Sequence, residues 1–255
     1  MQVTYMLYVD KIITVTKRNA NEQAFLKSYT PEQFDRPSVA VDIVILTIKE
    51  GKLYALLTER NEYPFKGSWS LIGGFIGIDE SLDDAAKRIL REKGKLTRVY
   101  LEQLYTFGSP KRDPRMRIIS VSYYALVEAK KLKESATLRL FEVDVPWQGE
   151  KGGKVNLLDE AGKPYKLAFD HSDIIGMTIK RIRGKLEYVP IGFELLPKQF
   201  TLRQLQEVHE TILDKKLNKD AFRRKILASG LVEATGEYEE GKGFRPAEYY
   251  VYQGS

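Results

Sequence analysis

Residues 74–96 read GFIGIDESLDDAAKRILREKGKL, and the neighbouring elements are best understood from this stretch. A second glycine, Gly73, precedes it, and paired glycines let the backbone turn tightly and let a ligand approach closely. From about Ser81 the apolar side chains recur at i, i+3, i+4, i+7 and i+8, which predicts an amphipathic helix. They are Leu82, Ala85, Ala86, Ile89 and Leu90, and Gly94 is placed to end the helix. The stretch is therefore a glycine loop that leads into a helix with one buried face.

Strand patterns lie on both sides of this loop and helix. On the N-terminal side, two runs rich in β-branched residues flank a turn at 49–52, and a short run leads directly into Gly73. On the C-terminal side, two further runs flank a charged loop at 108–115. The strands are predicted at 38–48, 53–58, 69–72, 99–107 and 118–127. Strands, one helix and more strands in this order indicate a domain of α/β layers.

The next part of the chain is predicted to close this domain. Residues 142–166 are polar and glycine-rich, and we expect a long surface hairpin or insertion there. A helix then begins at Asp170, with Asp173 three residues later as in a capping box, and ends at Gly184. The stretch 185–197 contains two prolines and is predicted to be a linker.

Two helices and a hairpin are predicted at the C-terminal end. Thr201 with Gln204 has the spacing of a capping box and begins a helix that reaches residue 213. Asn218 is a suitable N-cap for a second helix, 219–229, which Gly230 ends. Strands at 231–238 and 248–252 flank a glycine turn. Helix, turn, helix and β-hairpin together indicate a winged helix.

The composition narrows the kinds of chemistry that the chain supports. Its 255 residues contain no cysteine and two histidines, which excludes disulfides, thiolate nucleophiles and sites rich in cysteine or histidine. No apolar run approaches the roughly 18 residues of a membrane span, and residues 1–20 lack the pattern of a secretory signal. We therefore expect a cytoplasmic protein without a membrane partner. The formal net charge of +6 permits a polyanionic partner.

The glycine loop and its helix resemble the Nudix box, G-x5-E-x7-R-E-U-x-E-E-x-G-U with U aliphatic, through Gly74, Glu80, Arg88 and Glu92. In that family the glutamates supply oxygen ligands to Mg²⁺ beside a pyrophosphate. Here Ile89 and Lys93 replace two of the three glutamates, so the formal charge of the three positions changes from −3 to 0. We therefore assign no catalytic residue, metal or cofactor, and expect Glu80 and Arg88 to form an ion pair that braces the loop against the helix.

Over roughly residues 29–252 the chain resembles the Nudix-related transcriptional regulators, which join a Nudix-like sensor to a winged helix. The matching stretches are 36–42, 101–108, 112–115, 168–171, 187–197, 200–206 and 222–225. The resemblance implies an α/β fold: a Nudix-like α/β/α sandwich with a mixed sheet, followed by a winged helix-turn-helix domain. It also implies a dimeric repressor of NAD-metabolism genes that ADP-ribose releases from its operator. One branch of the family senses L-arabinose, a pentose sugar, and some members hydrolyse ADP-ribose, so both remain alternatives.

We expect four segments along the chain. They are an N-terminal arm (1–36), a degenerate Nudix-like effector-binding domain (37–184), the linker (185–197) and a winged-helix DNA-binding domain (198–255). Within the arm, residues 5–9 and 12–15 have the composition of short strands, and residues 25–29 that of a short helix. A mobile or dimer-swapped arm is an equally good interpretation.

Cationic residues gather on the second helix of the C-terminal domain. Lys219 and Arg223 are four residues apart on one face, with Arg224 on the flank, while Phe222 and Ile226 form the apolar back. An apolar back and a cationic front suit the major groove of DNA. The alternative is a solvated basic face on a winged helix that binds protein.

Further DNA contacts are expected from the start of the first helix and from the wing. Thr201 and Arg203 begin the first helix, where backbone amides and the helix dipole suit phosphate. Lys242 and Arg245 lie at the predicted wing tip, within reach of phosphate or the minor groove. Two such domains in a homodimer predict a pseudo-palindromic operator.

The candidate effector residues come from the glycine loop and its helix, from the charged loop at 108–115, and from positions that follow the second strand. An anionic diphosphate favours arginines, and a lysine can stand in place of Mg²⁺. The residues assigned to this site are Arg60, Phe65, Gly73, Gly74, Lys93, Phe107, Arg112, Asp113 and Arg115. Among them, Phe65 and Phe107 are expected to stack on an adenine ring. We interpret His171 as a helix-cap or packing residue rather than a catalytic one.

Overall fold

The computed structural model describes residues 20–159, 161–240 and 246–254. The chain divides after Arg36 into two compact units, Met1–Arg36 and Pro37–Ser255. The first unit contains the helix α2 (Ala20–Ser28) and the short 3-10 helix η2 (Pro31–Gln33). Phe25, Tyr29 and Phe34 of this unit pack their rings in sequence and remain exposed. The strands expected at 5–9 and 12–15 lie outside the described residues.

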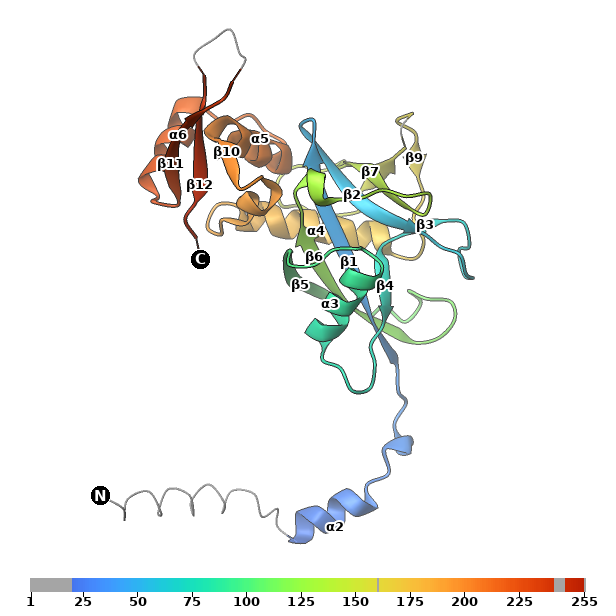
Figure 1. Cartoon of the computed structure of the whole chain (residues 1–255). Helices are drawn as coiled ribbons and strands as arrows, with labels where there is room; N and C mark the ends of the chain where they lie inside the picture. Colours follow the sequence, from blue (N-terminus) through green and yellow to red (C-terminus); the bar gives the residue numbers. More distant parts are fainter. Residues whose placement is uncertain (1–19, 160, 241–245, 255) are drawn as a thin grey trace, which may run out of the picture. The chain divides into compact units, whose positions relative to one another are not determined.

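A mixed sheet forms the centre of the second unit (Figure 1). Its strands are β1 (Ser38–Lys49), β2 (Lys52–Glu59), β3 (Trp69–Ser70), β4 (Ile72–Phe75), β5 (Tyr100–Phe107), β6 (Ile118–Leu126), β7 (Leu138–Asp144), β8 (Asn156–Leu158) and β9 (Pro164–Tyr165). They are hydrogen-bonded in the order β5-β6-β1-β2-β7-β8-β9, with β3 paired to β2 and β4 paired to β1. β1 runs parallel to β6 and antiparallel to β2 and β4, which confirms the predicted mixed sheet.

Two helices cover opposite faces of this sheet because successive side chains of β1 point in opposite directions. On one face Val41, Ile43 and Ile45 pack in a core with α3 (Leu82–Glu92), whose buried residues are Ala85, Ala86, Ile89 and Leu90. On the other face Val44 and Leu46 share a core with α4 (His171–Lys185), which contributes Ile174, Ile175, Ile179 and Ile182. The expected α/β/α sandwich is therefore confirmed, with α3 formed from the helix of the Nudix-like box.

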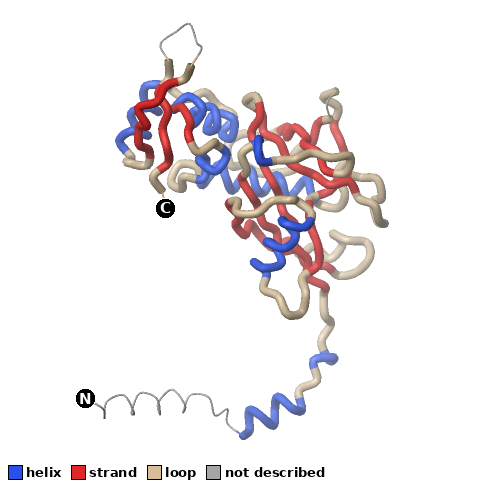
Figure 2. Tube along the Cα trace, viewed as in Figure 1, coloured by secondary structure: helices blue, strands red, loops and turns tan. Residues whose placement is uncertain are grey.

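The C-terminal part of the second unit is the expected winged helix (Figure 2). It contains β10 (Gln199–Thr201), α5 (Leu202–Leu213), α6 (Lys219–Ala228), β11 (Val232–Tyr238) and β12 (Glu248–Tyr252), and the strands pair in the order β10-β12-β11. The capping box of Thr201 and Gln204 is formed, and Asn218 caps α6 by accepting from the backbone amide of Ala221. Strand β10 was not predicted, because three residues are too few for a recognisable alternation.

The region between the two domains is more ordered than the sequence suggested. The predicted linker contains a 3-10 helix, η4 (Ile191–Leu195), which follows α4 after a turn. Its Ile191, Phe193 and Leu195 are buried in the core that also contains residues of α4 and α5. This proline-containing segment is therefore firmly packed, because its apolar side chains are buried together with those of α4 and α5.

Two further predictions about the Nudix-like domain were incomplete. Strand β7 was missed, and the 142–166 segment is more than a surface hairpin, because it pairs β8 with β7 and buries Trp147 and Leu157. Asp170 does precede α4, but its carboxylate makes no capping bond, since it is held by Arg112 instead. A last short 3-10 helix, η3, spans Ala129–Lys131. None of the helices in the described ranges is long and apolar enough to cross a membrane.

Candidate functional site

The glycine pair at the end of β4 lies directly against the helix of the Nudix-like box. A side chain at Gly73 would lie 2.4 Å from a carboxylate oxygen of Asp42, so only glycine fits there without movement. The Lys93 ammonium, just past the end of α3, donates to the Gly73 carbonyl oxygen at 2.5 Å. Gly74 lies beside the side chains of Ile89 and Lys93. The two substituted box positions therefore both face the glycine loop.

The loop between β4 and α3 is braced by the predicted ion pair of Glu80 and Arg88. Their closest atoms are 2.6 Å apart, and Arg88 also donates to the Phe75 carbonyl oxygen at 3.1 Å. Glu80 in turn accepts from the backbone amide of Gly77 at 2.6 Å. The Arg88 guanidinium and this amide lower the pKa of Glu80 to about 2. The expected structural role of this pair is thus confirmed.

The residues present do not suit Mg²⁺ at this box. Ile89 is fully buried and apolar, and Glu92 already lies 3.5 Å from Arg88 and 3.8 Å from Arg91. The cation on the Gly73 carbonyl oxygen is the Lys93 ammonium rather than a metal. Across the described residues, no three His, Asp or Glu side chains are arranged to hold a metal ion. A divalent cation needs several hard oxygen ligands, and this helix does not offer them.

A buried ionic network centred on Arg112 lies beside the glycine loop. The Arg112 side chain is only 4% exposed and donates to Asp170 at 2.8 and 3.0 Å and to Asp42 at 3.2 Å. Asp42 also accepts from the Ser120 hydroxyl at 2.6 Å. The network joins β1, β6, the loop after β5 and the start of α4. Because two carboxylates engage its guanidinium, Arg112 holds these elements in place.

His171, the first residue of α4, completes this network. The Leu71 backbone amide donates to its Nδ1 at 2.9 Å, so Nδ1 carries no proton. The proton of the neutral ring is then on Nε2, which lies 3.8 Å from Asp42. Burial lowers the pKa of His171, which keeps the ring neutral. The packing role expected for His171 is consistent with this geometry.

Aromatic rings and two arginines gather around Phe169, which precedes α4. The Phe65 ring lies edge-on at 4.9 Å, the Arg60 guanidinium carbon is 4.8 Å from the Phe169 ring centre, and that of Arg115 is 5.9 Å away. Arg115 also lies 5.8 Å from the ring of Phe75. Such arrangements are favourable for a cation over an aromatic face. Phe169 has a φ of +53°, which is unusual for a bulky residue and is typical of functional sites.

The two arginines of this cluster differ in their electrostatic partners. Arg115 forms an ion pair with buried Asp113 at 2.8 Å. Arg60 instead donates to the carbonyl oxygens of Pro64 and Glu62, at 2.8 and 3.4 Å. Burial and the positive charge of Arg115 lower the pKa of Arg60. A partly buried guanidinium that holds only neutral acceptors and is repelled by a neighbour is suited to an external anion.

The structure brings most, but not all, of the predicted effector residues together. Arg60, Phe65 and Arg115 meet at Phe169, while Gly73, Gly74 and Lys93 meet at the start and end of the box. Phe107 packs instead against Tyr105, at 5.4 Å between ring centres. The partner of the Phe65 ring is therefore Phe169, which stands far from it in the sequence.

Three important residues were missed among the predicted site residues. Asp42 is a single carboxylate inside an otherwise apolar strand, and this pattern could have identified it as a buried polar centre. Phe169 and Asp170 were noticed as part of a matching stretch but were not assigned to the site. Nothing in their local sequence shows that they lie beside Arg60 and Arg112.

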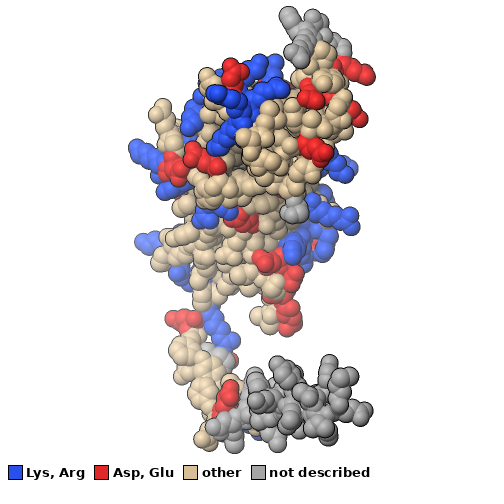
Figure 3. Space-filling model, turned by 90° about the vertical axis from the view of Figure 1, so that its left-hand side faces the viewer, with Lys and Arg blue, Asp and Glu red and all other residues tan. Residues whose placement is uncertain are grey.

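The candidate nucleic-acid interface is the outer side of α6. Phe222 and Ile226 are buried, whereas Lys219, Arg223 and Arg224 are exposed. Figure 3 shows Lys and Arg side chains gathered over the winged-helix part of the face that it presents, with a few acidic side chains at the border. Among the described residues of this domain, ion pairs join Arg203 to Glu207 and Lys216 to Glu210, and neither pair includes one of these α6 cations.

The other predicted DNA contacts are placed less favourably or lie outside the described residues. Thr201 is 2% exposed, and its hydroxyl accepts from the Gln204 amide as a cap. Arg203 is exposed and forms its ion pair with Glu207 at 2.9 Å. Lys242 and Arg245 are not among the described residues.

Comparison with known proteins agrees with both halves of this architecture. Two protein-family models match the chain: the NUDIX domain over residues 36–148, and the NrtR DNA-binding winged helix domain over residues 192–252. The chain is 36% identical to the ADPR responsive transcriptional repressor NtrR of Acinetobacter baylyi, over 91% of this chain and 89% of that protein. It is also 34% identical to an ADP-ribose pyrophosphatase of Methanocaldococcus jannaschii, over 54% of this chain and 71% of that protein.

A similar solved structure extends across both domains. The crystal structure of Shewanella oneidensis NrtR complexed with a 27mer DNA matches with a TM-score of 0.71 and 32% identity, and the match covers 84% of this chain and 93% of that chain. The sequence relatives, the two domain matches and the shared fold agree with the geometry described above. The chain therefore belongs to the NrtR family of Nudix-related transcriptional regulators.

Proposed function

We propose that this protein is a transcriptional repressor that binds operator DNA through its winged helix and is released when ADP-ribose binds its Nudix domain. The observation that carries the proposal is the exposed cationic front of α6, whose residues take no part in the ion pairs that the structure describes in this domain. The relative from Acinetobacter baylyi, named as an ADPR responsive repressor and similar over nearly its whole length, supports the choice of effector. The regulated genes are those of NAD metabolism.

DNA recognition is assigned to α6, with support from its surroundings. Lys219, Arg223 and Arg224 face the major groove, where guanidinium groups read guanine edges and neutralise phosphates. Arg203 and the wing residues Lys242 and Arg245 contact the backbone, while Thr201 contributes through the capped start of α5. The protein acts as a cytoplasmic homodimer, and its twofold axis selects a pseudo-palindromic operator.

The effector residues divide into those that contact the ligand and those that position them. Arg60, Arg115 and Lys93 supply positive charge to the diphosphate, and Phe65 with Phe169 offers an aromatic wall for the adenine. Arg112 acts indirectly because its buried guanidinium is held by Asp42 and Asp170, and Asp113 acts indirectly because it is buried and orients the more exposed Arg115. Gly73 and Gly74 keep the loop close to Lys93, whereas Phe107, which packs against Tyr105, is given no contact with the ligand.

The Nudix domain of this protein is catalytically inactive. The Lys93 ammonium donates to the Gly73 carbonyl oxygen. A metal ion at this place would need that oxygen as a free ligand. The Lys93 ammonium and a divalent cation about 4 Å apart would repel by roughly 8 kcal/mol at an effective dielectric constant of 20. That repulsion is sufficient to prevent Mg²⁺ from binding at ordinary millimolar concentration.

The domain plan that accompanies this function has four parts. Residues 37–184 bind the effector, residues 198–255 bind DNA, residues 185–197 connect them, and residues 1–36 form an arm. The packing of η4 against both helical neighbours supports a firm connection rather than a loose tether.

The test is fluorescence anisotropy with a labelled DNA fragment from upstream of the protein's own operon, titrated first with ADP-ribose and then with L-arabinose. Binding that ADP-ribose reverses is the expected result. Reversal by L-arabinose alone would assign the protein to a sugar-responsive function. Failure to prefer this fragment over a scrambled one, together with Mg²⁺-dependent turnover of ADP-ribose, would instead favour the hydrolase function of the Methanocaldococcus jannaschii relative.

A further inference from the structure

Arg183, near the end of α4, is a buried cation that reaches from the effector domain to the winged helix. It is 3% exposed, and its Nε donates to the Ile212 carbonyl oxygen, in the last turn of α5, at 2.7 Å. Its Nη1 donates to the carbonyl oxygens of Gly149 and Trp147 at 3.0 and 3.3 Å, and the guanidinium lies over the Trp147 ring. Buried cations are usually paired with a carboxylate. Here three carbonyl oxygens, one at the electronegative end of α5, take that role.

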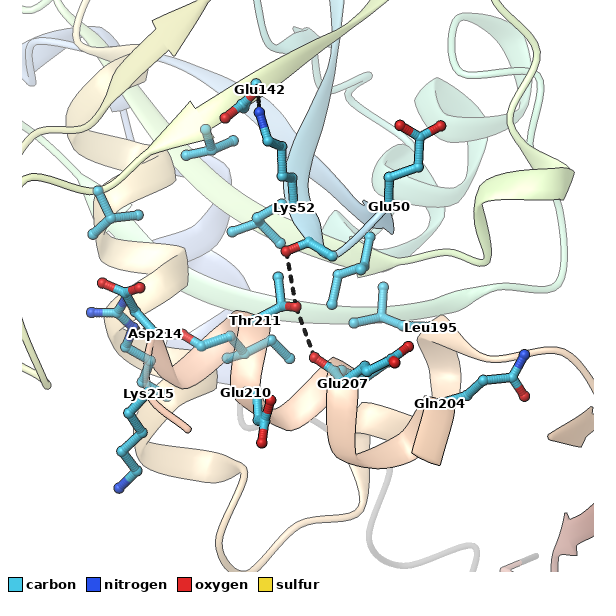
Figure 4. Close-up of a pocket in the computed structure, with 18 of the residues that line it drawn as sticks. Glu50, Lys52, Glu142, Leu195, Gln204, Glu207, Glu210, Thr211, Asp214 and Lys215 are labelled. Carbon is cyan, nitrogen blue, oxygen red and sulfur yellow. Dashed lines mark hydrogen bonds and ion pairs between the residues drawn. The ribbon is translucent and has the colours of Figure 1, made fainter. Parts of the chain in front are cut away.

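A second polar contact reaches the same turn of α5 from the β1–β2 hairpin. The Thr211 hydroxyl, which also approaches the Glu207 carbonyl oxygen, lies 3.2 Å from the carbonyl oxygen of Gly51 (Figure 4). Gly51 is at the tip of the hairpin, with a φ of +72°. Residues 211 and 212 are neighbours, so the polar contacts of Gly51 and Arg183 with α5 converge on one turn.

Next to this turn, an open crevice of about 950 Å³ separates α5 from the hairpin. Glu50 and Lys52 line it from the hairpin, and Gln204 and Glu207 line it from α5 (Figure 4). Leu205 of α5 is packed in the core, and Val208 and Ile212, although buried in the same core, also border the crevice. Close-packed interfaces resist movement, whereas open space permits it. The N-terminal turns of α5 therefore have room to tilt toward the β1–β2 hairpin while the last turn of α5 acts as the pivot.

The other end of α4 lies in the candidate effector site. Asp170 and His171, at its start, are bound to Arg112 and to the Leu71 amide. The helix has 15 residues, so it is about 22 Å long at 1.5 Å per residue. Its apolar face is buried in one continuous core with β1 and α5, which makes it a stiff connection.

We infer that α4 transmits effector binding to the helix-turn-helix and that Arg183 is the positioning residue through which it moves α5. This inference rests on the function proposed above. An anion held by Arg60 and Arg115 attracts Arg112 and weakens its hold on Asp170, which shifts the start of α4. Arg183 carries that shift to the last turn of α5, and α6 moves with α5. In a dimer, the two α6 helices then no longer match two half-sites.

The test compares Arg183→Met with Arg181→Met. Arg181 lies on the same helix, but it donates to the Leu104 carbonyl oxygen inside the effector domain, at 3.1 Å. The quantity measured is the coupling factor, the DNA Kd at saturating ADP-ribose divided by the DNA Kd without it. In Arg183→Met we expect the factor to fall at least tenfold while ADP-ribose affinity, measured by calorimetry, stays within threefold of the wild type. Arg181→Met should keep the wild-type factor. A wild-type factor in Arg183→Met would overturn the inference.

Two additional measurements test the inference if Arg183→Met does not fold or if ADP-ribose does not release the wild-type protein from DNA. If Arg183→Met does not fold, Thr211→Val removes the hairpin contact together with the hydroxyl's bond to the Glu207 carbonyl oxygen within α5, and the coupling factor should fall about threefold; an unchanged factor would count against the inference. If ADP-ribose does not release the wild type, the proposed function fails, and hydrogen exchange without ligand decides the role of Arg183. The amides of residues 211–215 should then exchange at least tenfold faster in Arg183→Met than in Arg181→Met. Equal exchange rates in the two variants would show that the hydrogen bond from Arg183 to the Ile212 carbonyl oxygen does not hold the last turn of α5.

Discussion

The helices α3 and α6 are similar in build but differ in how far their arginines are engaged by their own domain. Each has 10 or 11 residues, a buried apolar side and several outward cations. In α3, Arg88 pairs with Glu80 at 2.6 Å and Arg91 with Glu92 at 3.8 Å, and Lys93, immediately after the helix, donates to the Gly73 carbonyl oxygen. In α6, the exposed Lys219, Arg223 and Arg224 lie apart from the ion pairs of the winged helix. Paired cations organise their own fold, whereas the α6 cations, which have no ion-pair partner in the part of the chain that the structure describes, are available to an outside polyanion.

The largest expected effect is on DNA binding by α6. Replacing Lys219 and Arg223 with glutamine should weaken operator binding about 100-fold near 0.1 M salt, because each lost phosphate contact removes about 0.9 from the slope of log K against log salt. That slope should therefore fall by about 1.8, as measured by anisotropy between 50 and 300 mM salt. The control pair Lys87→Gln and Lys163→Gln removes the same charge from exposed positions of the Nudix domain. An equal loss in the control pair would show that α6 has no special role.

The next largest effect tests how closely the glycine loop is packed. A methyl group at Gly73 would lie 2.4 Å from Asp42 and 2.8 Å from the Val41 carbonyl oxygen. Gly73→Ala should therefore lower the free energy of unfolding by about 1–3 kcal/mol, measured by urea denaturation. Gly74→Ala is the matched control, since its methyl group would meet the flexible end of Ile89 at 3.3 Å. Equal losses at the two glycines would contradict the close approach assigned to Gly73.

A smaller effect is expected from the cation at the end of α3. Lys93→Glu should weaken ADP-ribose binding about tenfold in calorimetry, or about 1.4 kcal/mol, because it replaces an attractive charge near the diphosphate with a repulsive one. Lys87→Glu makes the same change on the exposed side of α3 and should leave affinity unchanged. An unaltered affinity in Lys93→Glu would remove Lys93 from the effector site and leave it as a purely structural cation.

The smallest expected effect concerns the ion pair that braces the box. Glu80 has a pKa of about 2 in the folded protein, below its ordinary value, because of Arg88 and the Gly77 amide. The pair therefore stabilises the fold above about pH 4.5, and this contribution disappears as the pH falls toward 2. The Tm difference between wild type and Glu80→Gln should be largest at pH 7 and should narrow between pH 5 and pH 3. Glu187→Gln, at an exposed position, serves as the control. A difference independent of pH would mean that the carboxylate charge is not what stabilises this loop.

Much of the fold followed from periodic patterns that act over short distances. The apolar spacing of α3, the β-branched run of β1 and the caps at Thr201 and Asn218 all depend on residues within a few positions of one another. The matches to the family's domains confirm the order of sandwich and winged helix. The short strands β9 and β10 were missed because their pairing, rather than their own sequence, makes them strands.

The candidate site was only partly predictable, for a different reason. Arg112 belonged to a charged loop that suggested a ligand contact, yet the fold brings Asp42 and Asp170 to its guanidinium from 70 and 58 residues away. Phe65 was expected to share a ligand with Phe107, but its ring meets Phe169. Whether a charged group already has an ion-pair partner, or a ring already packs on another ring, depends on residues that are distant in the sequence.

The sequence by itself determined the two-domain plan, the weakened box and the amphipathic character of α3 and α6, because each is encoded in local spacing and residue type. Only the tertiary structure decided which cations are neutralised, that Lys93 lies on the Gly73 carbonyl oxygen, and that α4 joins the effector network to α5 through Arg183. These depend on long-range packing, which brings side chains together regardless of their separation along the chain.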